Sequence, residues 1–145
     1  MPSPILSWQV WALLAAVFAA LTAIFAKIGV ENVNSDLATF IRTVVILVAL
    51  GGILIALGEF RGLPEIPARS YAFLVLSGLA TGASWLCYFR ALQLGNASQV
   101  APIDKLSVLL VAIFGVTFLG EKLSALNWLG IAAIAGGTFL VAYRA

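Results

Sequence analysis

The stretch Tyr88–Lys122, YFRALQLGNASQVAPIDKLSVLLVAIFGVTFLGEK, places an Asp–Lys pair inside an otherwise apolar segment. Asp104 and Lys105 form that pair, and Pro102 comes shortly before it. Hydrocarbon does not solvate charge, so a charged residue at the centre of a membrane helix costs about 2.5–3.5 kcal/mol on insertion scales. Such residues need an internal partner, a water-filled cavity or a ligand. The stretch therefore predicts a functional site within the membrane.

The composition of the whole chain indicates a membrane protein. Of 145 residues, 63% are hydrophobic and 10% are charged, whereas a soluble domain carries about 25% charged residues. The formal net charge of +2 gives no nucleic-acid signature. The chain has no His and a single Cys, Cys87, which excludes an internal disulfide and argues against a metal site. With no nucleophile–base pair and no cofactor motif, we expect neither an enzyme nor a bound cofactor.

Five apolar runs are long enough to cross a hydrocarbon layer of about 30 Å at about 1.5 Å per residue. They are continuous, unlike the short alternating segments of membrane β-barrels. The sequence therefore predicts an all-α membrane protein with one domain over residues 1–145. The five predicted transmembrane helices span about residues 8–26, 37–57, 70–92, 99–119 and 125–143.

The distribution of Lys and Arg predicts that the chain inserts in both orientations. Five spans put the two termini on opposite sides of the membrane. Three cations near each interface balance one another: Arg61, Arg69 and Lys122 on one side, and Lys27, Arg90 and Arg144 on the other. Arg42 and Lys105 lie deeper on the second side and would raise its count to five. The positive-inside bias is weak, so an antiparallel pair of chains becomes feasible.

Charged residues within the spans are the first candidates for a site. Arg42 lies about 9 Å into its helix and Lys105 about 10 Å into another, at 1.5 Å per residue. Arg42 and Asp104 would pair if these helices are neighbours. Consecutive residues of a helix point about 100° apart, so Asp104 and Lys105 are expected to turn toward different helices. Two interpretations stay open: an ion network that fixes packing, with snorkelling cations, or substrate and proton handling.

Pro102 is a candidate gate. It removes the amide that would bond the Ser98 carbonyl, which would leave a free carbonyl and a kink beside Asp104. Alternatively, Pro102 lies within the first helical turn and disturbs little.

A polar stripe marks the third predicted helix. Its members recur at helical spacing on one face: Ser77, Thr81, Ser84 and Tyr88. Trp85 lies beside the stripe and far from either interface, where it would suit a cavity for an organic cation or amphiphile. The competing interpretation is helix packing with hydroxyls bonded to backbone carbonyls. The candidate substrate-binding residues are Arg42, Thr81, Ser84, Trp85, Tyr88, Asp104 and Lys105.

The same stretch resembles the EamA family of the drug/metabolite transporter superfamily. The residues that carry the resemblance are Ala91–Ser98 (ALQLGNAS), Val100–Ile103 (VAPI), Phe118–Leu123 (FLGEKL) and Gly130. They resemble the family's "AL-x-x-G-x-AS" turn, "VAP" helix start and "LGE-x-L" helix end. Members of this family usually have ten helices, built from two inverted repeats of five. The resemblance implies that this chain corresponds to one such repeat. It also implies a small-molecule transporter that completes itself by homodimerising, without naming a substrate.

The chain departs from the related small multidrug resistance proteins. Those have four helices and a carboxylate in the first, whereas Trp8–Ala26 contains no acidic residue. If protons couple to transport, Asp104 is the best carboxylate available. We therefore expect a transporter of small organic solutes, working by alternating access as a homodimer in a bacterial or archaeal inner membrane. The alternative is a non-transporting membrane subunit that packs against a larger partner and assists or regulates it.

Overall fold

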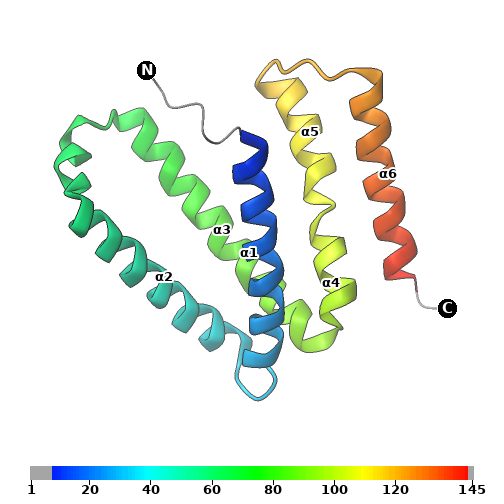
Figure 1. The fold of residues 1–145 in the computed structure, drawn as a ribbon, viewed down its shortest axis with the longest axis horizontal. Helices are drawn as coiled ribbons and strands as arrows, with labels where there is room; N and C mark the ends of the chain where they lie inside the picture. Colours follow the sequence, from blue (N-terminus) through cyan, green and yellow to red (C-terminus); the bar gives the residue numbers. More distant parts are fainter. Residues whose placement is uncertain (1–7, 144–145) are drawn as a thin grey trace. The chain divides into compact units, whose positions relative to one another are not determined.

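The protein is all-helical in the computed structural model, which describes residues 8–143. Within that range five helical segments are long and apolar enough to cross a membrane. The predicted fold class is thereby confirmed. The segments are α1 (Trp8–Gly29), α2 (Ser35–Leu57), α3 (Ala68–Leu94), the consecutive pair α4 (Ala97–Asp104) and α5 (Ser107–Phe118), and α6 (Ala125–Ala142) (Figure 1).

The helix surfaces carry apolar side chains outward. Large exposed side chains such as Leu47, Leu79 and Leu140 occur in several helices, and the last is 80% exposed. A water-soluble domain would bury such residues, whereas lipid tails or a second protein chain cover them in a membrane.

The chain folds into two compact units. One comprises residues up to Ile24 together with those from Leu94 onward, and the other is the continuous segment Phe25–Gln93. The first unit is therefore built from two stretches that are far apart in the sequence. The prediction of a single domain stays a prediction.

The Phe25–Gln93 unit contains the end of α1, all of α2, a 3₁₀ helix η1 (Glu59–Glu65) and almost all of α3. Asn34 caps α2, because its side-chain oxygen accepts hydrogen bonds from the amides of Asp36 and Leu37 at 2.9 and 3.1 Å. Gly58 ends α2 in the left-handed conformation, with φ of 72°, which glycine adopts without steric cost. The chain can thus turn sharply into η1.

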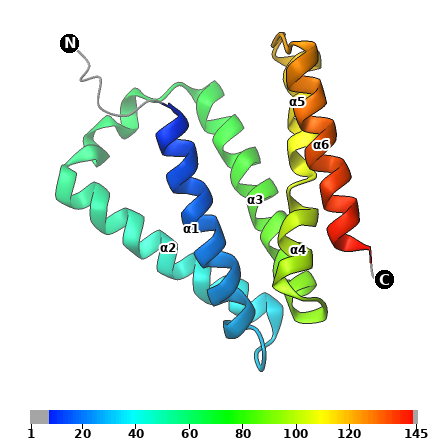
Figure 2. The same ribbon diagram turned by 45° about the vertical axis from the view of Figure 1, so that its right-hand side comes forward.

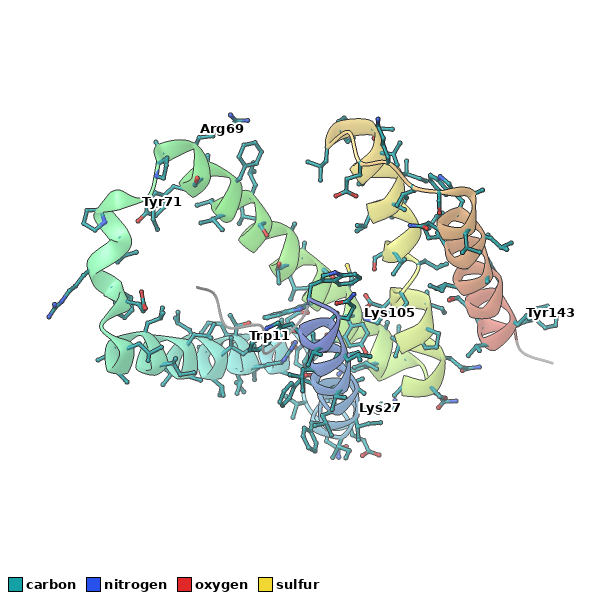
Figure 3. The ribbon with its side chains drawn as sticks, turned by 45° about the horizontal axis from the view of Figure 1, so that its top comes forward. Trp11, Lys27, Arg69, Tyr71, Lys105 and Tyr143 are labelled. Atoms are coloured by element: carbon teal, nitrogen blue, oxygen red, sulfur yellow. The ribbon has the colours of Figure 1, made fainter. Side chains whose placement is uncertain are left out.

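Side-chain hydrogen bonds to backbone carbonyls connect the elements at each end of this unit. At the η1 end, the Tyr71 hydroxyl donates to the Leu63 carbonyl at 3.1 Å, and Figure 3 labels Tyr71 at the start of α3. At the opposite end, Lys27 Nζ donates to the Leu92 carbonyl at 2.6 Å. The Gln93 amide donates to the Val33 carbonyl at 2.6 Å. The turn between α1 and α2 is therefore held against the last turn of α3.

In the other unit, α6 packs along both α4 and α5, as Figure 2 shows. Ser124 caps α6 as its sequence position indicates, since its hydroxyl accepts the Asn127 amide at 3.2 Å. The turn before it begins at Gly120, whose φ is 69°. The Glu121 amide donates back to the Gly115 carbonyl at 3.0 Å, which closes the end of α5.

The fourth span is interrupted, which the sequence prediction of one continuous helix over residues 99–119 missed. α4 ends at Asp104 and α5 begins at Ser107. Across the break, the amides of Lys105 and Leu106 bond to carbonyls only three residues back, each at 3.0 Å. Such bonds belong to a tighter 3₁₀-type turn. Pro102 lies one turn before the break, and its missing amide removes the helical hydrogen bond to the Ser98 carbonyl.

Candidate functional site

An arginine lies over two aromatic rings in the Phe25–Gln93 unit. The guanidinium carbon of Arg42, on α2, is 4.2 Å from the ring centroid of Trp85 and 5.4 Å from that of Phe89, both on α3. Phe89 is buried, while Arg42 and Trp85 are half-buried. Tyr88 interacts electrostatically with the same guanidinium. A cation over an aromatic face is stabilised by the ring quadrupole, most strongly over Trp. We call Arg42, Trp85 and Phe89 the arginine–aromatic cluster.

The cluster contains two residues for which the sequence predicted different partners. Arg42 was weighed as a partner of Asp104, and Trp85 as the wall of a cavity for an organic cation. The structure instead sets the protein's own cation against Trp85. Phe89 was not predicted, because nothing in the sequence distinguishes it from other apolar residues of α3.

The hydroxyl stripe of α3 is only partly available for binding. Thr81 donates to the Ser77 carbonyl of its own helix at 2.9 Å, as the competing interpretation of bonded hydroxyls expects. Ser84 is exposed and Tyr88 is half-buried beside Trp85. A threonine whose hydroxyl proton is used within the helix keeps only acceptor lone pairs for a ligand.

Asp104 and Lys105 form an ion pair with each other, with Lys105 Nζ 3.3 Å from Asp104 Oδ2. The expectation that the two side chains turn toward different helices is therefore wrong. It assumed a regular α-helix, whereas α4 ends at Asp104 and the next two residues form a tighter turn, with φ of −71° and ψ of −6° at Lys105. Both side chains are partly exposed, 55% for Lys105 and 39% for Asp104. Figure 3 labels Lys105 at the break between α4 and α5.

Thr138 of α6 supports the break. Its hydroxyl lies 2.9 Å from the Ile134 carbonyl and 3.3 Å from the Pro102 carbonyl, and the residue is 5% exposed. Pro102 is inside α4 and beyond its first turn, because the helix begins at Ala97. The interpretation of a disturbed helix is thus favoured over that of a harmless first-turn proline. The sequence could not identify Thr138, which lies far from Pro102 along the chain.

The candidate residues fall into two groups, each within one unit. Arg42, Thr81, Ser84, Trp85 and Tyr88 belong to the Phe25–Gln93 unit, and the other unit contains the candidates Pro102, Asp104 and Lys105. Over residues 8–143 no three His, Cys, Asp or Glu side chains gather in a way that could hold a metal ion.

A comparison with protein families identifies the fold. The sequence model of the EamA-like transporter family matches residues 6–143.

The chain belongs to the EamA-like transporter family. The resemblance inferred from the Tyr88–Lys122 stretch is thereby confirmed, and the chain is an integral membrane protein of a transporter family. It is similar to a Sinorhizobium sp. protein named "Uncharacterized transporter in cobO 3'region", with 65% identity over 136 residues, covering 94% of this chain and 96% of that protein.

The chain is also similar to a longer protein. "Uncharacterized transporter YxxF" of Bacillus subtilis (strain 168) is 28% identical over 137 residues, which cover 93% of this chain but 42% of that protein. No solved structure matches the chain.

Proposed function

We propose that the chain transports a small organic solute across the membrane by alternating access, as a homodimer. The observation that carries the proposal is the family match over residues 6–143. Both relatives named above are called transporters. The five spans supply the membrane scaffold that this function needs. We place the protein in the cytoplasmic membrane of a bacterium or archaeon.

The homodimer is supported by the length of the Bacillus relative. This chain aligns with 42% of that protein, so two copies would supply a comparable number of spans. Transporters with inverted repeats place their substrate site at the repeat interface, near the middle of the bilayer. A second, antiparallel copy would complete such an interface.

Alternating access is supported by the interrupted fourth span. Discontinuous helices in transporters expose backbone groups and helix ends to substrates and ions near the membrane midplane. Here the break between α4 and α5 carries the Asp104–Lys105 ion pair beside Pro102. We propose that Arg42, Thr81, Ser84, Trp85, Tyr88, Asp104 and Lys105 line the substrate path, with Pro102 at the gate.

The test is transport by purified protein in liposomes. A thermal-shift screen against a metabolite library first selects ligands, since a compound that binds only the folded protein raises its apparent stability. Each selected compound is then loaded into proteoliposomes, and exchange with the external labelled compound is measured. Saturable exchange that is absent from empty liposomes supports transport. If no ligand of the folded protein is exchanged, the transport proposal fails and a non-transporting membrane subunit becomes the better account.

A further inference from the structure

The guanidinium of Arg42 lies about two helical turns from the ends of α2 and α3, against the rings of Trp85 and Phe89. Arg42 is seven residues into α2 from Ser35, or about 10 Å. Trp85 is nine residues from the end of α3 at Leu94, or about 14 Å. The Lys27–Leu92 and Gln93–Val33 hydrogen bonds place the two helix ends at the same level. The guanidinium lies over both Trp85 and Phe89. Phe89 is five residues from Leu94, or about 8 Å, so the cation stays near the level of the Arg42 backbone, between the two rings.

Among the side chains of this unit that the structure describes, Arg42 forms no ion pair. The side chains of Glu31, Asp36 and Glu59 belong to the described part of Phe25–Gln93, and none of them forms an ion pair with Arg42. Trp85 covers the guanidinium from one side but offers no hydrogen-bond acceptor. The guanidinium carries five N–H donors in one plane, arranged to bind a carboxylate through two parallel bonds. The Tyr88 hydroxyl, which interacts with the same guanidinium, cannot occupy all five donors, so an edge of the guanidinium can still bind a ligand.

We propose that the arginine–aromatic cluster is the anion site of the transporter and binds the carboxylate of a small, flat organic acid. This inference rests on the proposed transport function and names its substrate class. The carboxylate would bond to the edge of the Arg42 guanidinium. The apolar part of the acid would lie against the half-buried Trp85. A cationic substrate is disfavoured, because Arg42 already occupies the ring that would attract it.

The test compares three probes of nearly one shape and different charge: benzoate, benzamide and benzamidinium. Binding to the purified protein in dodecyl maltoside, whose head group carries no phosphate, is measured by equilibrium dialysis. We expect saturable binding of benzoate and at least tenfold weaker binding of the other two. This comparison uses the unaltered chain, so it does not depend on whether a variant folds. Equal binding of the three probes, or no saturable binding of benzoate, overturns the proposal.

Variants then assign the binding to Arg42. Arg42→Gln should weaken benzoate binding at least tenfold, and Arg42→Lys, which keeps the charge but loses the planar fork, should weaken it less. Arg69→Gln is the matched control, because Arg69 also lies over a ring, with its guanidinium 5.9 Å from the Phe73 centroid, but at the start of α3. Benzoate binding that is unchanged in Arg42→Gln contradicts the proposal, and so does an equal loss in Arg69→Gln.

Two further measurements distinguish a lipid ligand from a solute, and anion binding from transport. A lipid phosphate has oxyanion chemistry similar to that of a carboxylate, so phosphatidylglycerol is added to the detergent sample. If it abolishes benzoate binding, the site belongs to lipid and the proposal is overturned; retained binding supports a solute. Benzoate that binds through Arg42 but is not exchanged in proteoliposomes upholds the anion site and counts against transport. Exchange of a cationic solute that survives Arg42→Gln upholds transport and overturns the anion site.

Discussion

The ion-pair partner of Asp104 depends on the local backbone. In a continuous helix its charge would need a partner from another helix, but the end of α4 lets it pair with the adjacent Lys105 at 3.3 Å. Removing one partner of a sealed ion pair typically costs about 3–5 kcal/mol, whereas an exposed pair contributes about 0–1 kcal/mol. With 39% of the Asp104 side chain exposed, an intermediate cost is expected.

We therefore predict that Asp104→Asn destabilises the protein by about 1–3 kcal/mol, because Lys105 loses its counter-ion within an apolar span. The measurement is the unfolding midpoint in detergent. The double variant Asp104→Asn with Lys105→Gln is the control, and it should be more stable than Asp104→Asn alone. If Asp104→Asn is as stable and as active as the parent chain, the ion pair has no structural role.

Gly115 illustrates a contact that no local pattern predicts. A Cβ at this position would lie 2.5 Å from Glu121 Oε2 and 3.1 Å from Glu121 Cδ. The turn at Gly120 folds the chain back, so that the Glu121 side chain lies against α5. Gly115, which is not part of the Gly120–Glu121 motif, thus makes room for the carboxylate of that motif.

Gly115→Ala should consequently displace the Glu121 side chain and destabilise the protein by about 1 kcal/mol, at the low end of the cost of overpacking. Combined with Glu121→Ala, the same substitution should instead stabilise the helix by about 0.5–1 kcal/mol, because alanine favours helix over glycine. Thermal unfolding of the parent chain, the two single variants and the double variant shows whether Gly115→Ala stabilises or destabilises each background. An equal effect of Gly115→Ala in both backgrounds would show that Glu121 does not occupy this space.

Among the secondary-structure elements, the transmembrane helices could be predicted from the sequence, whereas the interruption of the fourth span could not. Twenty-residue apolar runs indicate transmembrane helices because the hydrocarbon thickness fixes their length. Pro102 marks a weak point in the fourth span, yet the interruption comes at Lys105 and Leu106. Thr138, which another helix supplies, has its hydroxyl 3.3 Å from the Pro102 carbonyl next to this break.

The same limit applies to the candidate site. The sequence identified Arg42 and Trp85 as unusual because each departs from the ordinary composition of a membrane helix. It could not pair them, since they lie on different helices and the pairing depends on how α2 and α3 pack. Lys27 and Gln93, which hold the end of α3 by hydrogen bonds, were likewise not predicted as a structural pair.

Thr138→Val tests the support of the break. Valine keeps the shape but removes the hydroxyl that lies 3.3 Å from the Pro102 carbonyl. We expect a loss of about 0.5–1.5 kcal/mol and faster amide exchange at residues 105–109, since hydrogen bonds between membrane helices average about 0.6 kcal/mol. Thr117→Val is the control, because the Thr117 hydroxyl is exposed and bonds within its own helix, to the Ile113 carbonyl at 2.8 Å. Thr138→Val should lose more stability and exchange its amides faster than Thr117→Val. Equal effects of the two variants would contradict a special role for Thr138.

For the whole molecule, the balance of cations has a consequence for assembly. The sequence prediction assigns three cations to each membrane side: Arg61, Arg69 and Lys122 to one, and Lys27, Arg90 and Arg144 to the other. Of these, Arg144 lies outside the described residues. A chain with a strong bias would insert one way and form only parallel pairs, whereas a balanced chain supplies both orientations. Two copies of one five-helix repeat can form an inverted pair only when both orientations are present in the membrane.

We accordingly predict that C-terminal reporter fusions are found on both sides of the membrane. A fluorescent reporter that folds in the cytoplasm and a phosphatase that is active only outside it should both give signal from the same chain. Adding one Lys beyond the last helix should shift the distribution toward a cytoplasmic C-terminus, and adding one Lys to the Glu59–Glu65 loop should shift it the other way, because cations favour the cytoplasmic side. Reporting from one side alone, unmoved by either added Lys, would exclude the antiparallel homodimer. A parallel dimer or a different partner would then have to complete the transporter.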